Sequence, residues 1–264
     1  MKISEAFVLV AAGTAGGLLS TVVSIASLVS YPVLLALGVS PLSANMTNTV
    51  SLVLTGAGSV AGSRPELTGQ RDRVLRYGTV TALGGIAGAA VLLIAPASTF
   101  TAVAPVLIGG ASFLLLVQPK VTALAPHLDK DAIADEATDP ARLDERGPAH
   151  IAVLFVVAMY VGYFGAAAGV MLLVVLGTMI AEQLVRVNAI KNAVSGAANG
   201  MAAICFAIFG SVRWLFVGPL AAGFLLGGWL GPKIARRIPA TMLRIVVSLC
   251  GIALAARLGI TAYR

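Results

Sequence analysis

Polar side chains that could bind an anion share one face of an otherwise apolar segment. Residues 188–209 read as a membrane-spanning helix, but they include a lysine and four neutral hydrogen-bonding residues. At 100° per residue, the four neutral residues fall within about 60° of one another on a helix, and the lysine lies at the edge of that sector. They are Asn188, Asn192, Ser195 and Asn199, with Lys191 as the cation.

A lysine inside a membrane-spanning segment costs about 2.5–3.5 kcal/mol on insertion scales, so it usually faces a bundle interior or a wet cavity. One cation among four neutral hydrogen-bonding groups is the pattern that an anion pathway requires. Two alternatives stay open for Lys191: an ion pair with Glu182, or snorkelling of its ammonium group to the membrane surface.

A second polar stripe lies in the apolar run at 43–62. Asn45, Asn48, Thr55 and Ser59 fall within about 80° on one helix face, with Thr49 close to them. The alternative is that Asn, Ser and Thr only bind helix to helix, at about 0.6 kcal/mol per contact in a measured case. Two such stripes together with Lys191 favour a substrate pathway.

The composition indicates a polytopic membrane protein with all-α structure. The chain is 58% hydrophobic and only 11% charged, whereas soluble domains carry about 25% charged residues. The net charge of +7 is better explained by cationic cytoplasmic loops than by a nucleic-acid partner. Neither the two cysteines nor the two histidines are spaced for a metal, haem or disulfide, so no cofactor is expected.

An enzyme is a poor fit to this sequence. The apolar runs contain no central Asp or Glu, because Glu5 and Glu182 lie at run ends. No nucleophile–base pair, metal cluster or phosphate-binding loop is visible. The same lack of a central acid gives little support to a carboxylate proton relay.

Two of the eight apolar runs are expected to be broken. About 20 residues cross the hydrocarbon core, but the runs at 6–38 and 150–181 are too long for one upright helix and too short for two. Irregular backbone at membrane depth is tolerated where it lines a cavity. The sequence leaves open whether each run forms a re-entrant hairpin or a short crossing pair. The other runs are 43–62, 74–95, 100–118, 188–209, 214–232 and 242–262.

The expected breaks add candidate binding residues. Helix N-termini at the breaks would offer free N–H groups and positive dipole ends to an anion. Ser27 and Tyr31 belong to the first break, and Gly165 and Gly169 to the second. The alternative for the two glycines is plain helix packing, since they form a small-xxx-small pair.

The two halves of the chain look like an internal repeat. Residues 48–51 (NTVS) match 192–195 (NAVS), and residues 84–88 (GGIAG) match 227–231 (GGWLG). The sequence thus predicts a first transmembrane repeat at 1–118, a polar loop at 119–149 and a second transmembrane repeat at 150–264.

The loop charges predict that the repeats are inverted. With an odd number of crossings in each half, the loops at 63–76 and 233–240 share a side and carry seven bases, against one on the other side. The positive-inside rule favours that arrangement. Each half would then hold a broken or re-entrant helix pair and three transmembrane helices, with the 119–149 loop in the cytoplasm and both termini outside.

Several segments resemble the sulfite exporter TauE/SafE family, also called the 4-toluene sulfonate uptake permeases. The similarity covers most of the chain except 119–149, and it implies an inner-membrane permease for anions such as sulfite, sulfonates or sulfoacetate. The similar stretches are 31–41 (YPVLLALGVSP), 44–50 (ANMTNTV), 162–165 (GYFG), 188–192 (NAIKN) and the two GGxxG pieces.

We therefore expect a secondary transporter or permease that moves small anions across the inner membrane by alternating access, in which one repeat rocks against the other. The expected partners are the anion and the lipid bilayer. The alternatives are an anion channel, and a membrane assembly protein whose polar stripes only hold helices together.

Overall fold

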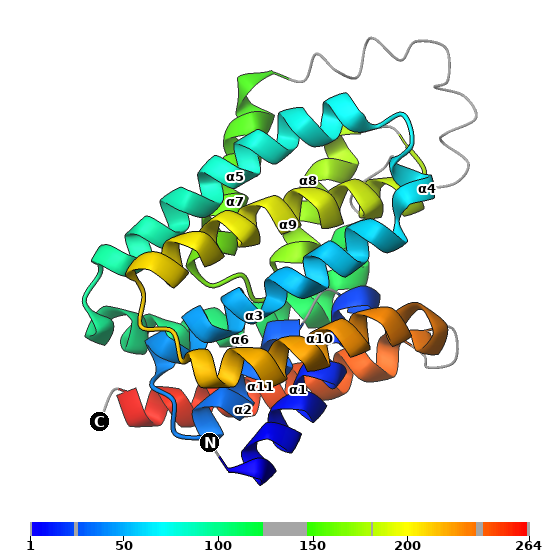
Figure 1. Ribbon diagram of the computed structural model, residues 1–264. Helices are drawn as coiled ribbons and strands as arrows, with labels where there is room; N and C mark the ends of the chain where they lie inside the picture. Colours follow the sequence, from blue (N-terminus) through cyan, green and yellow to red (C-terminus); the bar gives the residue numbers. More distant parts are fainter. Residues whose placement is uncertain (1, 24–25, 124–146, 181, 236–239, 263–264) are drawn as a thin grey trace.

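The computed structural model describes residues 2–23, 26–123, 147–180, 182–235 and 240–262, and every regular element in these ranges is an α-helix (Figure 1). The predicted all-α class is confirmed for this part of the chain. The helices are α1 Ile3–Val23, α2 Ala26–Ala36, α3 Pro41–Gly62, α4 Arg64–Leu67, α5 Arg71–Ile94, α6 Ala97–Ala123, α7 Pro148–Tyr163, α8 Ala168–Met179, α9 Leu184–Phe209, α10 Trp214–Ala235 and α11 Ala240–Ala262.

Both long apolar runs are broken, as their lengths predict. The first divides into α1 and α2, and the second into α7 and α8. At the second break, Gly165 has φ +71° and Ala167 has φ +56°. A positive φ is easy for glycine and uncommon for alanine, so α7 ends here and the chain reverses into α8. Ser24 and Ile25, within the first break, lie outside the described residues.

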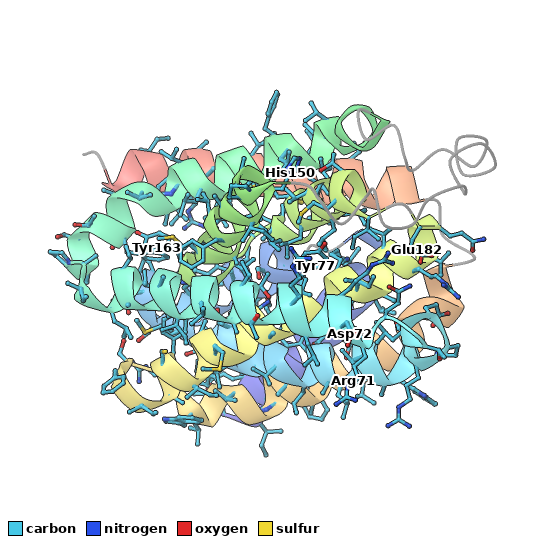
Figure 2. All side chains as sticks on the ribbon, turned by 90° about the horizontal axis from the view of Figure 1, so that it is seen from above. Arg71, Asp72, Tyr77, His150, Tyr163 and Glu182 are labelled. Atoms are coloured by element: carbon cyan, nitrogen blue, oxygen red, sulfur yellow. The ribbon has the colours of Figure 1, made fainter. Side chains whose placement is uncertain are left out.

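The two ends of the bundle differ in their contacts. At the Arg73 end, where α3 leads through α4 into α5 and α8 leads into α9, Arg73 Nη1 lies 3.1 Å from Glu182 Oε1. At the Arg213 end, where α2 leads into α3 and α9 leads into α10, the Arg213 backbone N–H donates to Thr47 Oγ1 over 3.0 Å. Figure 2 shows Glu182 and Tyr163 toward opposite ends of the bundle.

The first broken pair returns to the end at which it starts. α1 packs along α10 in the same direction, because Gly13 lies against Leu220 and Phe224, and Gly17 lies against Phe224 and Gly228. Since α10 begins at the Arg213 end, α1 begins there too. α2 leads into α3 at that same end, so α1 and α2 form a helical hairpin.

The second broken pair repeats this arrangement at the opposite end. α7 packs along α5 in the same direction, with Gly84 against Phe155 and Gly88 against Met159. α5 begins at the Arg73 end, so α7 starts there, and α8 returns there to lead into α9. The two GGxxG pieces thus lie in α5 and α10, the partners of the two hairpins.

The centre of the bundle is formed by α3 and α9, which lie side by side, while α6 packs against α11 (Figure 1). α3 also contacts α10, and α9 also contacts α5. Within the described residues, four helical segments are long and apolar enough to cross a membrane: Ile3–Ser20, Arg71–Ile94, Ala97–Val117 and Val185–Phe209. Several shorter apolar helices accompany them, including both members of the second hairpin.

We expect Gly88→Ala to destabilise the fold, because a Cβ at Gly88 would overlap the Met159 carbonyl oxygen on α7. Overpacking of this kind costs about 1–3 kcal/mol. Gly78→Ala is the matched control in the same helix, since a Cβ there meets nothing within 4 Å and alanine is the better helix former by about 1 kcal/mol. Thermal unfolding in detergent should show a lower midpoint for Gly88→Ala alone, and equal midpoints would contradict this packing.

Candidate functional site

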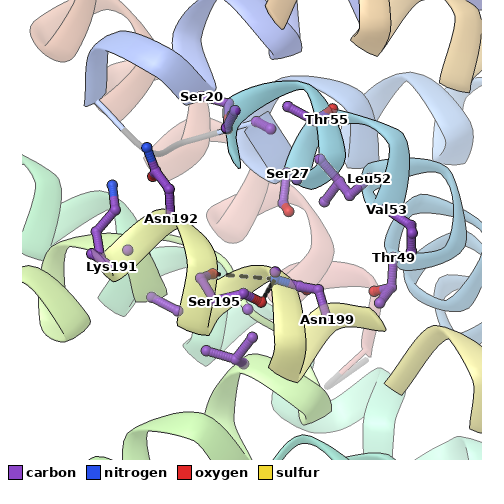
Figure 3. Close-up of a pocket in the computed structure, with 18 of the residues that line it drawn as sticks. Ser20, Ser27, Thr49, Leu52, Val53, Thr55, Lys191, Asn192, Ser195 and Asn199 are labelled. Atoms are coloured by element: carbon purple, nitrogen blue, oxygen red, sulfur yellow. Dashed lines mark hydrogen bonds between the residues drawn. The ribbon is translucent and has the colours of Figure 1, made fainter. Parts of the chain in front are cut away.

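A cavity of about 90 Å³ lies between the two hairpins and the central helices (Figure 3). Its lining begins near the middle of α3 and α9, at Thr49 and Asn199, and continues toward the Arg73 end, at Ser59 and Lys191. The polar residues that line it are Ser20, Ser27, Thr49, Thr55, Ser59, Lys191, Asn192, Ser195 and Asn199.

The α9 side of the cavity carries its one described cation. Lys191 is 4% exposed, and Asn192 follows it on the same helix (Figure 3). One turn further along, the Asn199 side-chain amide donates to the Ser195 carbonyl oxygen over 3.0 Å and to its hydroxyl over 3.3 Å. A buried ammonium group among neutral dipoles favours an anion over a cation in the adjoining space.

The α3 side faces α9 with hydroxyl groups. Thr49 donates to the Asn45 carbonyl one turn earlier, over 3.0 Å. Thr55 is 4% exposed, and its hydroxyl has no hydrogen-bond partner among the described residues. A buried hydroxyl without a partner costs about 1–3 kcal/mol, and Thr55 is such a residue in the cavity wall.

Both hairpins contribute the start of their second helix to the cavity wall. α2 begins at Ala26, and both Ala26 and Ser27 line the cavity. α8 begins at Ala168, and Ala168 and Gly169 line it from the other hairpin. Helix N-termini carry a partial positive charge, so their placement adds to the potential of Lys191.

A comparison with known protein families identifies the family of the chain. The sequence profile described as "Sulfite exporter TauE/SafE" matches residues 9–258. The chain belongs to the TauE/SafE family. No curated protein and no solved structure matches the chain at the level required for a comparison. TauE/SafE proteins are membrane transporters of sulfur anions and not enzymes, so the chain is a multi-pass membrane protein.

In this TauE/SafE protein, eight of the twelve residues predicted from the sequence lie around the cavity. Four come from the polar stripe at 188–199 on α9, two from the first hairpin and α3, and two from the second hairpin. They are Lys191, Asn192, Ser195, Asn199, Ser27, Thr49, Gly165 and Gly169.

The other four predicted residues are not part of the lining. The Asn45 side-chain amide donates to the Tyr163 carbonyl oxygen over 2.8 Å, and Asn48 donates to the Ser27 hydroxyl over 3.1 Å. Tyr31 is buried behind the wall, with its ring against Phe164. Asn188, half-buried one turn before Asn192, also lies outside the lining.

Three lining hydroxyls were not among those candidates. Thr55 and Ser59 belong to the first-half stripe, so the helical spacing already put them on the face that Thr49 adjoins. Ser20 near the end of α1 carried no such signal. Ser20 lies at the cavity because α2 folds back beside α1.

Glu182 is bound by basic and polar side chains at the Arg73 end (Figure 2). Its Oε1 accepts from Gln70 over 2.9 Å and from Arg73 over 3.1 Å. Its Oε2 lies 3.4 Å from Arg186 Nη1, and the Arg186 side chain is 44% exposed. Arg186 therefore takes part in this ion-pair cluster, between the helix end and Lys191.

Asn48→Ala is expected to lower stability, because Asn48 ties α3 to α2 through both Ser27 and Ser30. At about 0.6 kcal/mol per interhelical bond, the loss is about 1 kcal/mol. Ser51→Ala is the matched control on α3, since the Ser51 hydroxyl bonds only within its own helix, to Thr47. Thermal unfolding measures both, and a midpoint for Asn48→Ala as high as that of Ser51→Ala would argue against an anchoring role.

Proposed function

We propose that this protein is a secondary transporter that moves small sulfur-containing oxyanions across the inner membrane by alternating access, and that the cavity beside Lys191 is the binding site. The observation that carries the proposal is the placement of Lys191. It is 4% exposed, and it lines the cavity together with neutral hydrogen-bonding side chains. A cation held at membrane depth beside such a cavity suits an anionic ligand.

Neutral groups around Lys191 complete the proposed site. Asn192 supplies an amide, and Ser195 and Thr55 supply hydroxyls, at positions facing the same space (Figure 3). Such groups hydrogen-bond the oxygens of an oxyanion at less desolvation cost than several buried charges. Asn45 and Asn48 contribute to the site indirectly, because their hydrogen bonds hold Tyr163 and Ser27 in place.

The size of the cavity favours a small substrate. Pockets for drug-sized ligands measure about 300–1,000 Å³, whereas this cavity measures about 90 Å³. An ion of a few heavy atoms, such as sulfite or a short sulfonate, suits that space better than an aromatic sulfonate.

The charges at the two ends support an orientation with the Arg73 end in the cytoplasm. Arg64, Arg71, Arg73 and Arg76 lie near that end, against Lys2 and Arg213 near the other. Basic residues concentrate on the cytoplasmic side of membrane proteins. α7 starts at the Arg73 end, so the polar segment 119–149 is proposed to be cytoplasmic; residues 124–146 lie outside the described residues.

The helix contacts support inverted repeats as the basis of alternation. α1 packs on α10 and α7 packs on α5, while α3 faces α9 and α6 faces α11. If each helix is replaced by its counterpart in the other half of the chain, the same four helix pairs result. The two hairpins also enter the bundle from opposite ends. Rocking of one repeat against the other is a common transporter mechanism. An inside-negative potential would help export by about 2.3 kcal/mol per charge per 100 mV.

Radiolabelled sulfite flux into proteoliposomes under an imposed membrane potential tests the site. Wild type should give saturable, potential-sensitive flux, and Lys191→Ala should weaken apparent affinity about 10- to 100-fold, since a hydrogen bond to a charged group contributes about 1.5–3 kcal/mol. Arg186→Gln is the matched control, because it removes a cation from the same helix outside the cavity.

Equal loss of flux in Arg186→Gln and Lys191→Ala would contradict a specific role for the cavity cation. Flux that does not saturate and shows no counterflow would indicate a channel. Normal flux in a correctly folded Lys191→Ala variant would remove the cavity from the pathway. If sulfite does not move at all, short sulfonates and sulfoacetate are the next substrates to measure.

A further inference from the structure

The wall of the cavity that faces the Arg213 end contains an aromatic ring. Phe164 is the residue directly after α7, it lines the cavity, and it is 3% exposed. The crossing helices contribute lining residues only from about their middle toward the Arg73 end. Any route from the cavity to the Arg213 end must therefore pass this wall.

Two more aromatic rings pack behind Phe164. The Tyr31 ring on α2 meets it edge-on, with centroids 5.6 Å apart and an interplanar angle of 83°. The Phe100 ring, near the start of α6, lies 6.0 Å from Phe164 at an angle of 54°. Phe100 also lies 6.0 Å from the Tyr163 ring. Tyr31 and Phe100 are almost fully buried, so this aromatic cluster is closely packed on the side toward the Arg213 end.

One polar atom in the aromatic cluster is left without a partner. The Tyr31 hydroxyl is buried and has no hydrogen bond among the described residues. Other buried polar groups of α2 and α3 are paired: Ser30 with Asn48, and Asn45 with the Tyr163 carbonyl oxygen. A buried hydroxyl without a partner costs about 1–3 kcal/mol, and such groups in folded proteins call for an explanation.

The Phe164 ring takes no part in the hydrogen bonds that hold its turn. It lies between α7 and α8, directly before Gly165 with its φ of +71°. The backbone of this turn is held by the Tyr160 hydroxyl, which donates to the Ala166 carbonyl oxygen over 2.7 Å, and by Asn45 on the Tyr163 carbonyl. Rotation of the Phe164 side chain breaks none of these bonds.

We propose that the Phe164 ring is the gate between the cavity and the Arg213 end, and that its displacement exposes the Tyr31 hydroxyl to the passing anion. In the closed arrangement, Phe164 covers Tyr31. In the open arrangement, the hydroxyl gains the partner that it lacks, by donating a hydrogen bond to an oxygen of the oxyanion or its water. This inference rests on the proposed transport function for the role of Tyr31, while the gate itself is testable without transport.

Cysteine accessibility tests the gate. In a Cys205→Ser/Cys250→Ser background, Val53→Cys places a thiol in the cavity wall. A charged, membrane-impermeant methanethiosulfonate is then applied to membrane vesicles of either orientation. We expect labelling from the Arg73 side only, and we expect Phe164→Ala to raise the labelling rate from the Arg213 side at least 10-fold. Phe113→Ala, on a ring that is 63% exposed on α6, should change nothing.

An unchanged labelling rate from the Arg213 side in Phe164→Ala would overturn the gate. Phe164→Leu provides a milder second variant if the alanine protein unfolds, and it should give an intermediate rate. Labelling does not depend on sulfite. A protein that shows the expected labelling but moves no sulfur anion would therefore contradict the proposed function and leave the gate in place.

Tyr31→Phe tests the hydroxyl. Because no hydrogen bond is lost, we expect an unchanged or higher thermal midpoint, together with a several-fold lower maximal rate of sulfite flux. Tyr160→Phe is the matched control, since it removes the bond to Ala166 and should lower the midpoint. Wild-type flux in Tyr31→Phe would overturn the role of the hydroxyl, and a lower midpoint would show that it has a structural partner.

Discussion

The structure depends on the need to hold a buried ammonium group inside an apolar helix bundle. Lys191 is 4% exposed, and burial of a charge without compensating dipoles costs far more than a typical protein can spare. The cavity wall that the structure describes beside it offers hydroxyls and amides, together with the starts of two helices. Each of these offers dipoles to a charged group without adding another full charge to the interior.

The cavity is lined by helices that end inside the bundle, and such ends require compensation elsewhere. The end of a helix leaves backbone groups that a continuous helix would have paired. The second hairpin is closed by the bond from Tyr160 to Ala166, and it is tied to α3 through Asn45. The first is tied to α3 through Asn48. Glycine-mediated contacts then fix α1 on α10 and α7 on α5, which positions both breaks at the cavity.

Several of these features could be predicted from the sequence, because they depend on local patterns. The apolar composition gives the class of protein, and the excess length of two apolar runs gives their breaks. Helical spacing put Asn192, Ser195 and Asn199 on one face, and all three line the cavity. The same spacing could not distinguish Thr49, which lines the cavity, from Asn45 and Asn48, which bind the turn and the serine behind it.

The sequence by itself determined which helix faces are polar, because the period of a helix is fixed by its backbone geometry. It also determined the family, through motifs spread over most of the chain. Only the tertiary structure decided which polar residues share a cavity. The hairpins return to the ends from which they start, and this reversal brings Ser20 and Ser27 near α9 and places Phe164 over Tyr31. Such contacts depend on the relative placement of helices far apart in the sequence, which no local spacing encodes.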